Sequence, residues 1–231
     1  MLTDLLLVRH GEAYNTAPVD GLREIRDRAN PPLTPLGERQ ARELVTVLSE
    51  FMPEAIVVSP FLRAVQTAWP YVSETTGAAP ATAIPVHVDR RFCEILADPV
   101  FSGFRGLDIA DYRARFGPRV ALNPALGDRA AFPAYPEPPD SVRTRVTALW
   151  NELVASPTTP ARVAFIGHGA SLSALLTSLV PEYTADIGHV NCGATHLRRT
   201  GPAAAPWSAL YVNRKDHLTR FGAAAALVSQ S

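Results

Sequence analysis

Three short apolar runs constrain the fold of this chain most strongly: Leu5–Val8, Ala55–Val58 and Val163–Ile166. Continuous apolar runs of this length are typical of strands covered on both faces, as in parallel sheets with helices on either side. The three runs therefore predict a buried central sheet.

Helical patterns separate these runs. Thr34-Pro35 reads as an N-cap followed by Pro at the first helical position. A second helix should follow from about Pro60 and break or kink at Pro70. The other expected segments are a strand over 84–88, a short helix over 108–116, a helix capped by Asp140, a helix over 170–180, and strands over 192–198 and 208–213. This alternation predicts a three-layer α/β fold, with a mostly parallel central sheet and helices on both faces.

The domain organisation is predicted to be simple. A length of 231 residues suits one domain spanning 1–231. Residues 17–33 are polar and Pro-rich, which indicates a loop. Residues 98–139 mix Gly, Pro, Phe and Arg with little periodicity. We interpret 98–139 as a lid or insertion over a site.

The charge balance argues against a nucleic-acid partner. Lys+Arg and Asp+Glu each number 22, giving a net charge of +0, and all the basic residues except Lys215 are Arg. Nucleic-acid binding needs a cationic footprint that this composition lacks. Since Arg is the default cation of this chain, a single Arg is informative only through its position.

The remaining composition predicts a cytoplasmic protein without a membrane segment. Two cysteines are too few for a disulfide framework. The N-terminus lacks the positive region of a signal peptide, and polar residues interrupt the apolar stretch 164–180. The oligomeric state cannot be read from the sequence.

Polar side chains follow each of the three apolar runs. Arg9 and His10 follow the first run, Arg63 follows the second, and His168 follows the third. Ligands of open α/β sheets bind outside the carboxyl ends of the strands, so we expect these four side chains at one rim. Two guanidinium groups and two imidazoles there suit a phosphate group.

Glycines follow both histidines directly. Gly11 and Gly169 lack a Cβ, and we expect their backbone N–H groups to approach a ligand. No Gly-rich phosphate loop with Lys is present, which disfavours a nucleoside triphosphatase. The spacing of histidines, thiols and carboxylates matches no zinc site, so no metal is predicted.

Six motifs in a fixed order resemble the histidine phosphatase superfamily, also called the phosphoglycerate-mutase-like superfamily. They are Arg9–Glu12, Leu33–Gly37 with Gln40-Ala41, Ser59–Ala64 with Gln66–Ala68, Glu94, Gly167–Gly169 and Asn191–Thr195. The first motif alone is only moderately specific, but the ordered set over about residues 4–200 is highly specific.

The resemblance implies a catalytic role for five residues. His10 would attack phosphorus and form a phosphohistidine, while Arg9, Arg63 and His168 bind the phosphoryl oxygens. Nearby Arg charges favour the neutral imidazole that this attack needs. Glu94 would protonate the leaving group. Water would then hydrolyse the phosphoenzyme without metal or cofactor.

Alternatives remain for several positions. Glu94 would otherwise be a surface carboxylate or a partner of Arg90 or Arg91, with Asp98 as the fallback acid. The family's Asn position is occupied by Thr16, so Asn15 or Thr16 would touch phosphate.

Two further family positions are less clear. Glu12 would orient the site or the chain. Pro139-Asp140-Ser141 stands where many members have Gly-Glu-Ser.

Three rival functions differ in chemistry. Residues 95–106 lack the mutase signature, which favours a phosphatase over a mutase-type phosphoryl transferase. The alternative that is not an enzyme is a non-catalytic phospholigand-binding module. Cys192 and Arg198 have the Cys-x5-Arg spacing of cysteine phosphatases. We interpret that spacing as coincidence, with Cys192 a buried small residue.

The expected substrate is a small-molecule phosphomonoester. Charges balance within both 17–33 and 98–139, which argues against a polyphosphate. The lid carries six aromatic residues: Phe101, Phe104, Tyr112, Phe116, Phe132 and Tyr135. They would contact a partly apolar or neutral-polar substrate body, or simply pack the lid.

Overall fold

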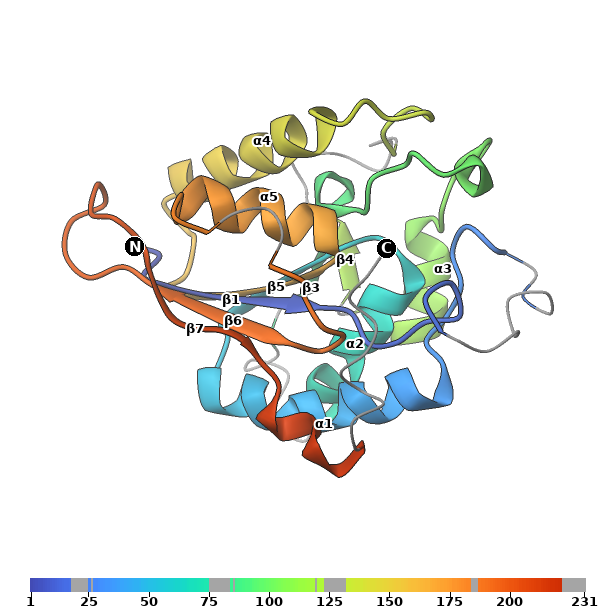
Figure 1. The fold of residues 1–231 in the computed structure, drawn as a ribbon, viewed down its shortest axis with the longest axis horizontal. Helices are drawn as coiled ribbons and strands as arrows, with labels where there is room; N and C mark the ends of the chain where they lie inside the picture. Colours follow the sequence, from blue (N-terminus) through green and yellow to red (C-terminus); the bar gives the residue numbers. More distant parts are fainter. Residues whose placement is uncertain are drawn as a thin grey trace.

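A computed structural model describes residues 1–17, 25, 27–74, 84, 86–118, 120–122, 132–183 and 187–221. Within these residues seven strands form one sheet in the order β4-β3-β2-β5-β1-β6-β7 (Figure 1). The strands are β1 Asp4–Arg9, β2 Ala55–Val58, β3 Val86–Val88, β4 Val120–Leu122, β5 Arg162–Gly167, β6 Ala194–Arg198 and β7 Ser208–Arg214.

The sheet is mostly parallel, as predicted. Strands β1 to β5 all run parallel to one another. Strand β6 is antiparallel to β1, and β7 is antiparallel to β6. The carboxyl ends of β1, β2 and β5 therefore meet at one edge of the sheet.

Helices cover both faces of the sheet, which makes the three expected layers (Figure 1). The α-helices are α1 Pro35–Phe51, α2 Leu62–Glu74, α3 Ile109–Phe116, α4 Ser141–Ala155 and α5 Gly169–Leu179. Three short 3₁₀-helices complete the described chain: η4 Arg90–Phe92, η5 Pro99–Phe101 and η7 Asp216–Phe221. None of the described helices is both long enough and apolar enough to cross a membrane.

The alternation of side chains along β1 explains why its sequence is apolar throughout. Leu6 and Val8 pack with α1 and α2, while Leu5 and Leu7 pack with α4 and α5. All four side chains are at most 1% exposed. Burying one such side chain contributes about 1.5–3 kcal/mol, so both helix layers hold the strand in place.

Two expectations about helix ends need correction. Of the expected break or kink at Pro70, the break is wrong. The second helix continues to Glu74, because Tyr71 and Val72 are buried in the core and offset the lost backbone hydrogen bond. Asp140 precedes α4, but its side chain makes no capping bond and instead accepts from Arg143 Nη2 at 2.9 Å.

The segment 98–139 is more regular than the expected lid with one short helix. It contains η5, α3 and the strand β4, which pairs in parallel with β3. Part of the segment thus extends the sheet. Residues 18–24, 26, 119 and 123–131, which complete the 17–33 loop and this segment, lie outside the described residues.

The start of α1 packs directly on the loop that follows β1. Thr34 caps α1 by accepting from the Gly37 N–H at 3.1 Å, as predicted. A Cβ on Gly11 would lie 2.7 Å from the Gly37 carbonyl oxygen, and a Cβ on Gly37 would overlap the Glu12 carbonyl oxygen. The backbone of the loop after β1 and the backbone of α1 are therefore in direct contact, and a side chain on either glycine would push them apart.

We expect Gly37→Ala to destabilise the protein although Gly37 lies in a helix. Helix propensity alone favours Ala by about 0.5–1 kcal/mol, but overpacking against a fixed backbone costs about 1–3 kcal/mol. Denaturant unfolding measures the balance. Gly169→Ala is the matched control, because a Cβ there meets nothing within 4 Å. A Gly37→Ala protein as stable as wild type would contradict the packing argument.

Candidate active site

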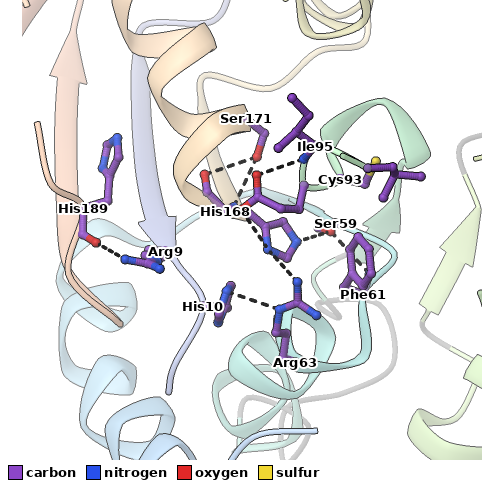
Figure 2. A network of polar contacts seen from close by, with 12 residues as sticks. Arg9, His10, Ser59, Phe61, Arg63, Cys93, Ile95, His168, Ser171 and His189 are labelled. Carbon is purple, nitrogen blue, oxygen red and sulfur yellow. Dashed lines mark hydrogen bonds and ion pairs between the residues drawn. The ribbon is translucent and has the colours of Figure 1, made fainter. Parts of the chain in front are cut away.

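The structure brings together the four side chains expected at the strand ends. Arg9 ends β1, His10 follows it, Arg63 lies in the first turn of α2, and His168 joins β5 to α5. Figure 2 shows His10, Arg63 and His168 converging on one centre, with Arg9 beside them. The site is thus built from segments far apart in the sequence.

His10 is held as a neutral imidazole whose lone pair lies on Nε2. Its Nδ1 lies 2.7 Å from the Gly11 carbonyl oxygen, which can only accept, so Nδ1 carries the proton. Arg63 Nε donates to His10 Nε2 at 3.3 Å. Burial, then the charges of Arg63 and Arg9, lowers the pKa of His10 well below 6.5.

His168 is completely buried beside His10, with ring centroids 4.9 Å apart. Its Nε2 lies 2.7 Å from the Ser59 hydroxyl, and its Nδ1 lies 3.4 Å from Arg63 Nη2. Burial, then the Arg63 charge, lowers its pKa well below 6.5. Ser59 was not among the predicted site residues, although it directly follows the apolar run of β2.

The Arg63 guanidinium is the most unusual group of the site. Arg63 is 1% exposed, and its guanidinium lies 4.3 Å from the centre of the Phe61 ring. Burial lowers its pKa to about 10, so it is still charged at neutral pH. Within the described residues its Nη1 is buried without a hydrogen-bond partner. A buried donor left unpaired costs about 1–3 kcal/mol or more, so Nη1 indicates an anionic ligand.

Glu94 lies at the edge of this cluster. Its Oε2 is 3.9 Å from His168 Nδ1, and its Oε1 accepts from the Ile95 N–H at 2.9 Å. The side chain is 25% exposed and thus open to solvent. Arg91 is not its partner, because it pairs with Asp89 and Glu152.

The fallback acid Asp98 lies outside the cluster. It is exposed and caps η5 by accepting from the Val100 N–H. Asn15 is also exposed and does not join the network of His10, Arg63 and His168 among the described residues. The Thr16 hydroxyl donates to the Ala13 carbonyl oxygen at 3.2 Å.

Gly11 and Gly169, which follow the two histidines, have different surroundings. The Gly11 N–H donates to the Thr67 hydroxyl at 3.0 Å, so the prediction that it faces a ligand is wrong. Gly169 begins α5, with open space at its Cβ position. Glu12 accepts from the Thr34 hydroxyl at 2.7 Å and therefore orients the chain.

Cys192 lies where the interpretation as a buried structural residue expects it. Cys192 is fully buried in the core, where burial raises the pKa of its thiol. Its backbone N–H donates to the Arg9 carbonyl oxygen at 2.9 Å. In the part of the chain that the structure describes, no three His, Cys, Asp or Glu side chains gather as metal ligands.

The two buried imidazoles predict lower stability at acid pH. Below pH 6.5 the unfolded chain protonates His10 and His168 while the native state does not, so the free energy of unfolding decreases as the pH is lowered. Replacing His10 with Asn should reduce this slope by up to about 1.4 kcal/mol per pH unit between about pH 6 and pH 5. Denaturant unfolding at several pH values measures it. An unchanged slope would contradict the burial of a neutral His10.

Known proteins share this fold. A structure of mycobacterial glucosyl-3-phosphoglycerate phosphatase with VO3 is 26% identical, with a TM-score of 0.59, and the match covers 92% of this chain and 100% of that chain. A phosphoserine phosphatase from Entamoeba histolytica is 22% identical, with a TM-score of 0.59, over 94% of this chain and 100% of that chain, and it supports the fold.

The curated relative matches only in part. Mannitol-1-phosphatase of Eimeria tenella is 40% identical over 76 residues, which are 30% of this chain and 24% of that protein. The chain thus spans about a quarter of that relative. A family model, in contrast, matches residues 5–213. The chain therefore belongs to the histidine phosphatase superfamily, branch 1.

Proposed function

We propose that this protein hydrolyses phosphomonoesters through a phosphohistidine on His10. The buried Arg63 carries this proposal. Its Nη1 has no hydrogen-bond partner among the described residues, and its Nε lies 3.3 Å from His10 Nε2, the atom that carries the lone pair. One phosphoryl group next to both would supply the missing acceptor and the electrophile. The phosphatases among the similar proteins support the same reaction class.

The first chemical step transfers the phosphoryl group to the enzyme. The Nε2 lone pair of His10 attacks phosphorus, and the ester P–O bond breaks. The leaving oxygen takes a proton from Glu94. Arg9 and Arg63 stabilise the charge on the other phosphoryl oxygens, together with the N–H of Gly169 at the start of α5. His168 donates to them from Nδ1 in the tautomer in which its Nε2 accepts from the Ser59 hydroxyl. Two guanidinium charges neutralise the phosphoryl group, so this step uses no metal ion or cofactor.

The second step returns the enzyme to its starting state. Water attacks phosphorus and gives its proton to the Glu94 carboxylate. The electrons of the P–N bond return to His10 Nε2, and inorganic phosphate leaves. The exposure of Glu94, 25%, gives this water access from solvent. This access of water to the phosphohistidine favours a phosphatase over a mutase, because a mutase has to retain its phosphoenzyme.

Aromatic rings beside the phosphate site suggest the substrate's body. The Phe61 ring meets the His168 ring at 5.1 Å and stacks on Phe104 at 5.2 Å. Phe132 contacts Phe104 in turn, at 4.8 Å, and both are partly exposed. We propose a substrate with a single phosphate whose partly apolar or neutral-polar body rests on these rings. The names of the relatives, a mannitol phosphatase and a glucosyl-phosphoglycerate phosphatase, agree with a small phosphorylated substrate.

We expect His10→Ala to lower kcat/KM for any phosphomonoester by at least about 10³-fold, because the nucleophile is lost. The wild-type protein, quenched during turnover, should carry acid-labile, base-stable phosphate that His10→Ala lacks. Mass spectrometry of the quenched protein measures it. Wild-type protein that binds phospholigands without hydrolysing them would instead identify the non-catalytic module.

We expect Phe104→Ala to raise KM for phosphomonoesters with an apolar body by about 3- to 10-fold, in line with the loss of one aromatic contact. The KM for glycerol phosphate should stay unchanged. Steady-state kinetics on a set of phosphorylated metabolites tests this, with Arg105→Ala as the matched exposed neighbour. Equal effects on both substrate types, or a preference for bisphosphates, would count against the proposed substrate class.

A further inference from the structure

One buried side chain holds the backbone that presents Glu94. Arg145 of α4 donates from Nη1 to the carbonyl oxygens of Arg91 and Cys93, at 2.6 and 2.9 Å, and from Nη2 to that of Glu94, at 3.1 Å. Its side chain is only 10% exposed. A single guanidinium group therefore satisfies three backbone carbonyl groups in a segment that runs from η4 to Glu94 and contains no strand or α-helix.

Glu137 orients this guanidinium and holds the far end of the same loop. Its Oε1 accepts from Arg145 Nε at 2.7 Å and from the Ser141 hydroxyl at 2.7 Å. Its Oε2 accepts from the Leu96 N–H, and its own N–H donates to the Leu96 carbonyl oxygen, both at 2.9 Å. Burial raises the pKa of Glu137, but these hydrogen bonds outweigh it and lower the pKa below its usual value. The carboxylate therefore stays charged.

The position of this ion pair matters because Glu94 has few other restraints. Among the described residues, the Glu94 carboxylate accepts one hydrogen bond, from the Ile95 N–H, and lies 3.9 Å from His168 Nδ1, while the charges of Arg9 and Arg63 act on it without a hydrogen bond. A general acid has to lie about 2.6–3.2 Å from the oxygen that it protonates. A displacement of about 1 Å can cost 10²-fold in rate.

We propose that Arg145, oriented by Glu137, is a positioning residue that fixes Glu94 for proton transfer to the leaving group. The inference rests on the proposed function and adds a requirement to it. The phosphoryl-binding residues lie on β1, α2 and α5, whereas the acid depends on α4. Proton donation should therefore be separable from phosphate binding.

Substrates with different leaving groups separate the two. An alkyl phosphate expels a strongly basic alkoxide and needs the acid, whereas p-nitrophenyl phosphate expels an anion that is stable near neutral pH. We expect Arg145→Lys and Glu137→Gln to lower kcat/KM for an alkyl phosphate by about 10- to 100-fold. The kcat/KM for p-nitrophenyl phosphate should change by less than about 3-fold, because kcat/KM includes only the steps up to release of the leaving group and not the later hydrolysis, which also uses Glu94. Inhibition by inorganic phosphate should not change.

Two comparisons complete the design. Glu94→Gln should show the same selective loss, and Arg143→Ala should show none, because Arg143 is exposed on the same helix and pairs only with Asp140 among the described residues. If thermal unfolding shows that Arg145→Lys or Glu137→Gln does not fold, Ser141→Ala decides the matter, since it removes one hydrogen bond of Glu137 and should give a smaller loss of the same selectivity.

The outcomes distinguish this inference from the proposed function. Equal losses with both substrates, no loss with either, or a change in phosphate inhibition overturns the positioning role. A wild-type protein that cleaves neither substrate, or a His10→Ala protein as active as wild type, overturns the proposed function itself.

Discussion

The buried charge of Arg63 is the interaction on which the rest of the site depends. A guanidinium that is 1% exposed has lost its water, and it is compensated by the Phe61 face and by two imidazoles, which accept only while neutral. The same charge helps to keep His10 and His168 unprotonated. The Arg63 charge therefore adds to burial in keeping His10 neutral, and its Nη1, which has no hydrogen-bond partner among the described residues, suits an anion.

The part of the site that depends on sheet topology is the part that the sequence predicts. Apolar runs such as Leu5–Val8 identify strands that are buried on both faces, and parallel strands bring their carboxyl ends to one edge. Arg9, His10, Arg63 and His168 come together for that reason alone. The prediction needs no knowledge of side-chain packing, because Arg9 ends β1, His10 and His168 directly follow β1 and β5, and Arg63 lies in the first turn of the helix after β2.

Contacts set by tertiary packing escape such prediction. Ser59 and His168 are 109 residues apart, and Arg145 reaches Cys93 across 52 residues, so no local pattern joins them. In a chain whose cations are almost all Arg, Arg145 has no distinguishing feature. Pro70 and Gly11 show the converse case, in which a local pattern gives a prediction that the tertiary structure contradicts. Local rules predict a helix break or kink at Pro70 and a ligand-facing amide at Gly11, whereas core burial continues the helix and the Thr67 hydroxyl accepts from that amide.

The division of the site into two supports has a consequence for how substrates are discriminated. The residues proposed to bind the phosphoryl group lie at or just after the ends of β1 and β5 and in the first turn of α2, while Glu94 lies on a loop tied to α4 by a buried ion pair. The aromatic rings that start at Phe61 contact His168. In the proposed reaction, phosphate recognition, proton donation and contact with the substrate's body thus rest on separate segments. A change in the leaving group can then be accommodated at the loop and the rings without disturbing the buried Arg63, whose charge tolerates no rearrangement.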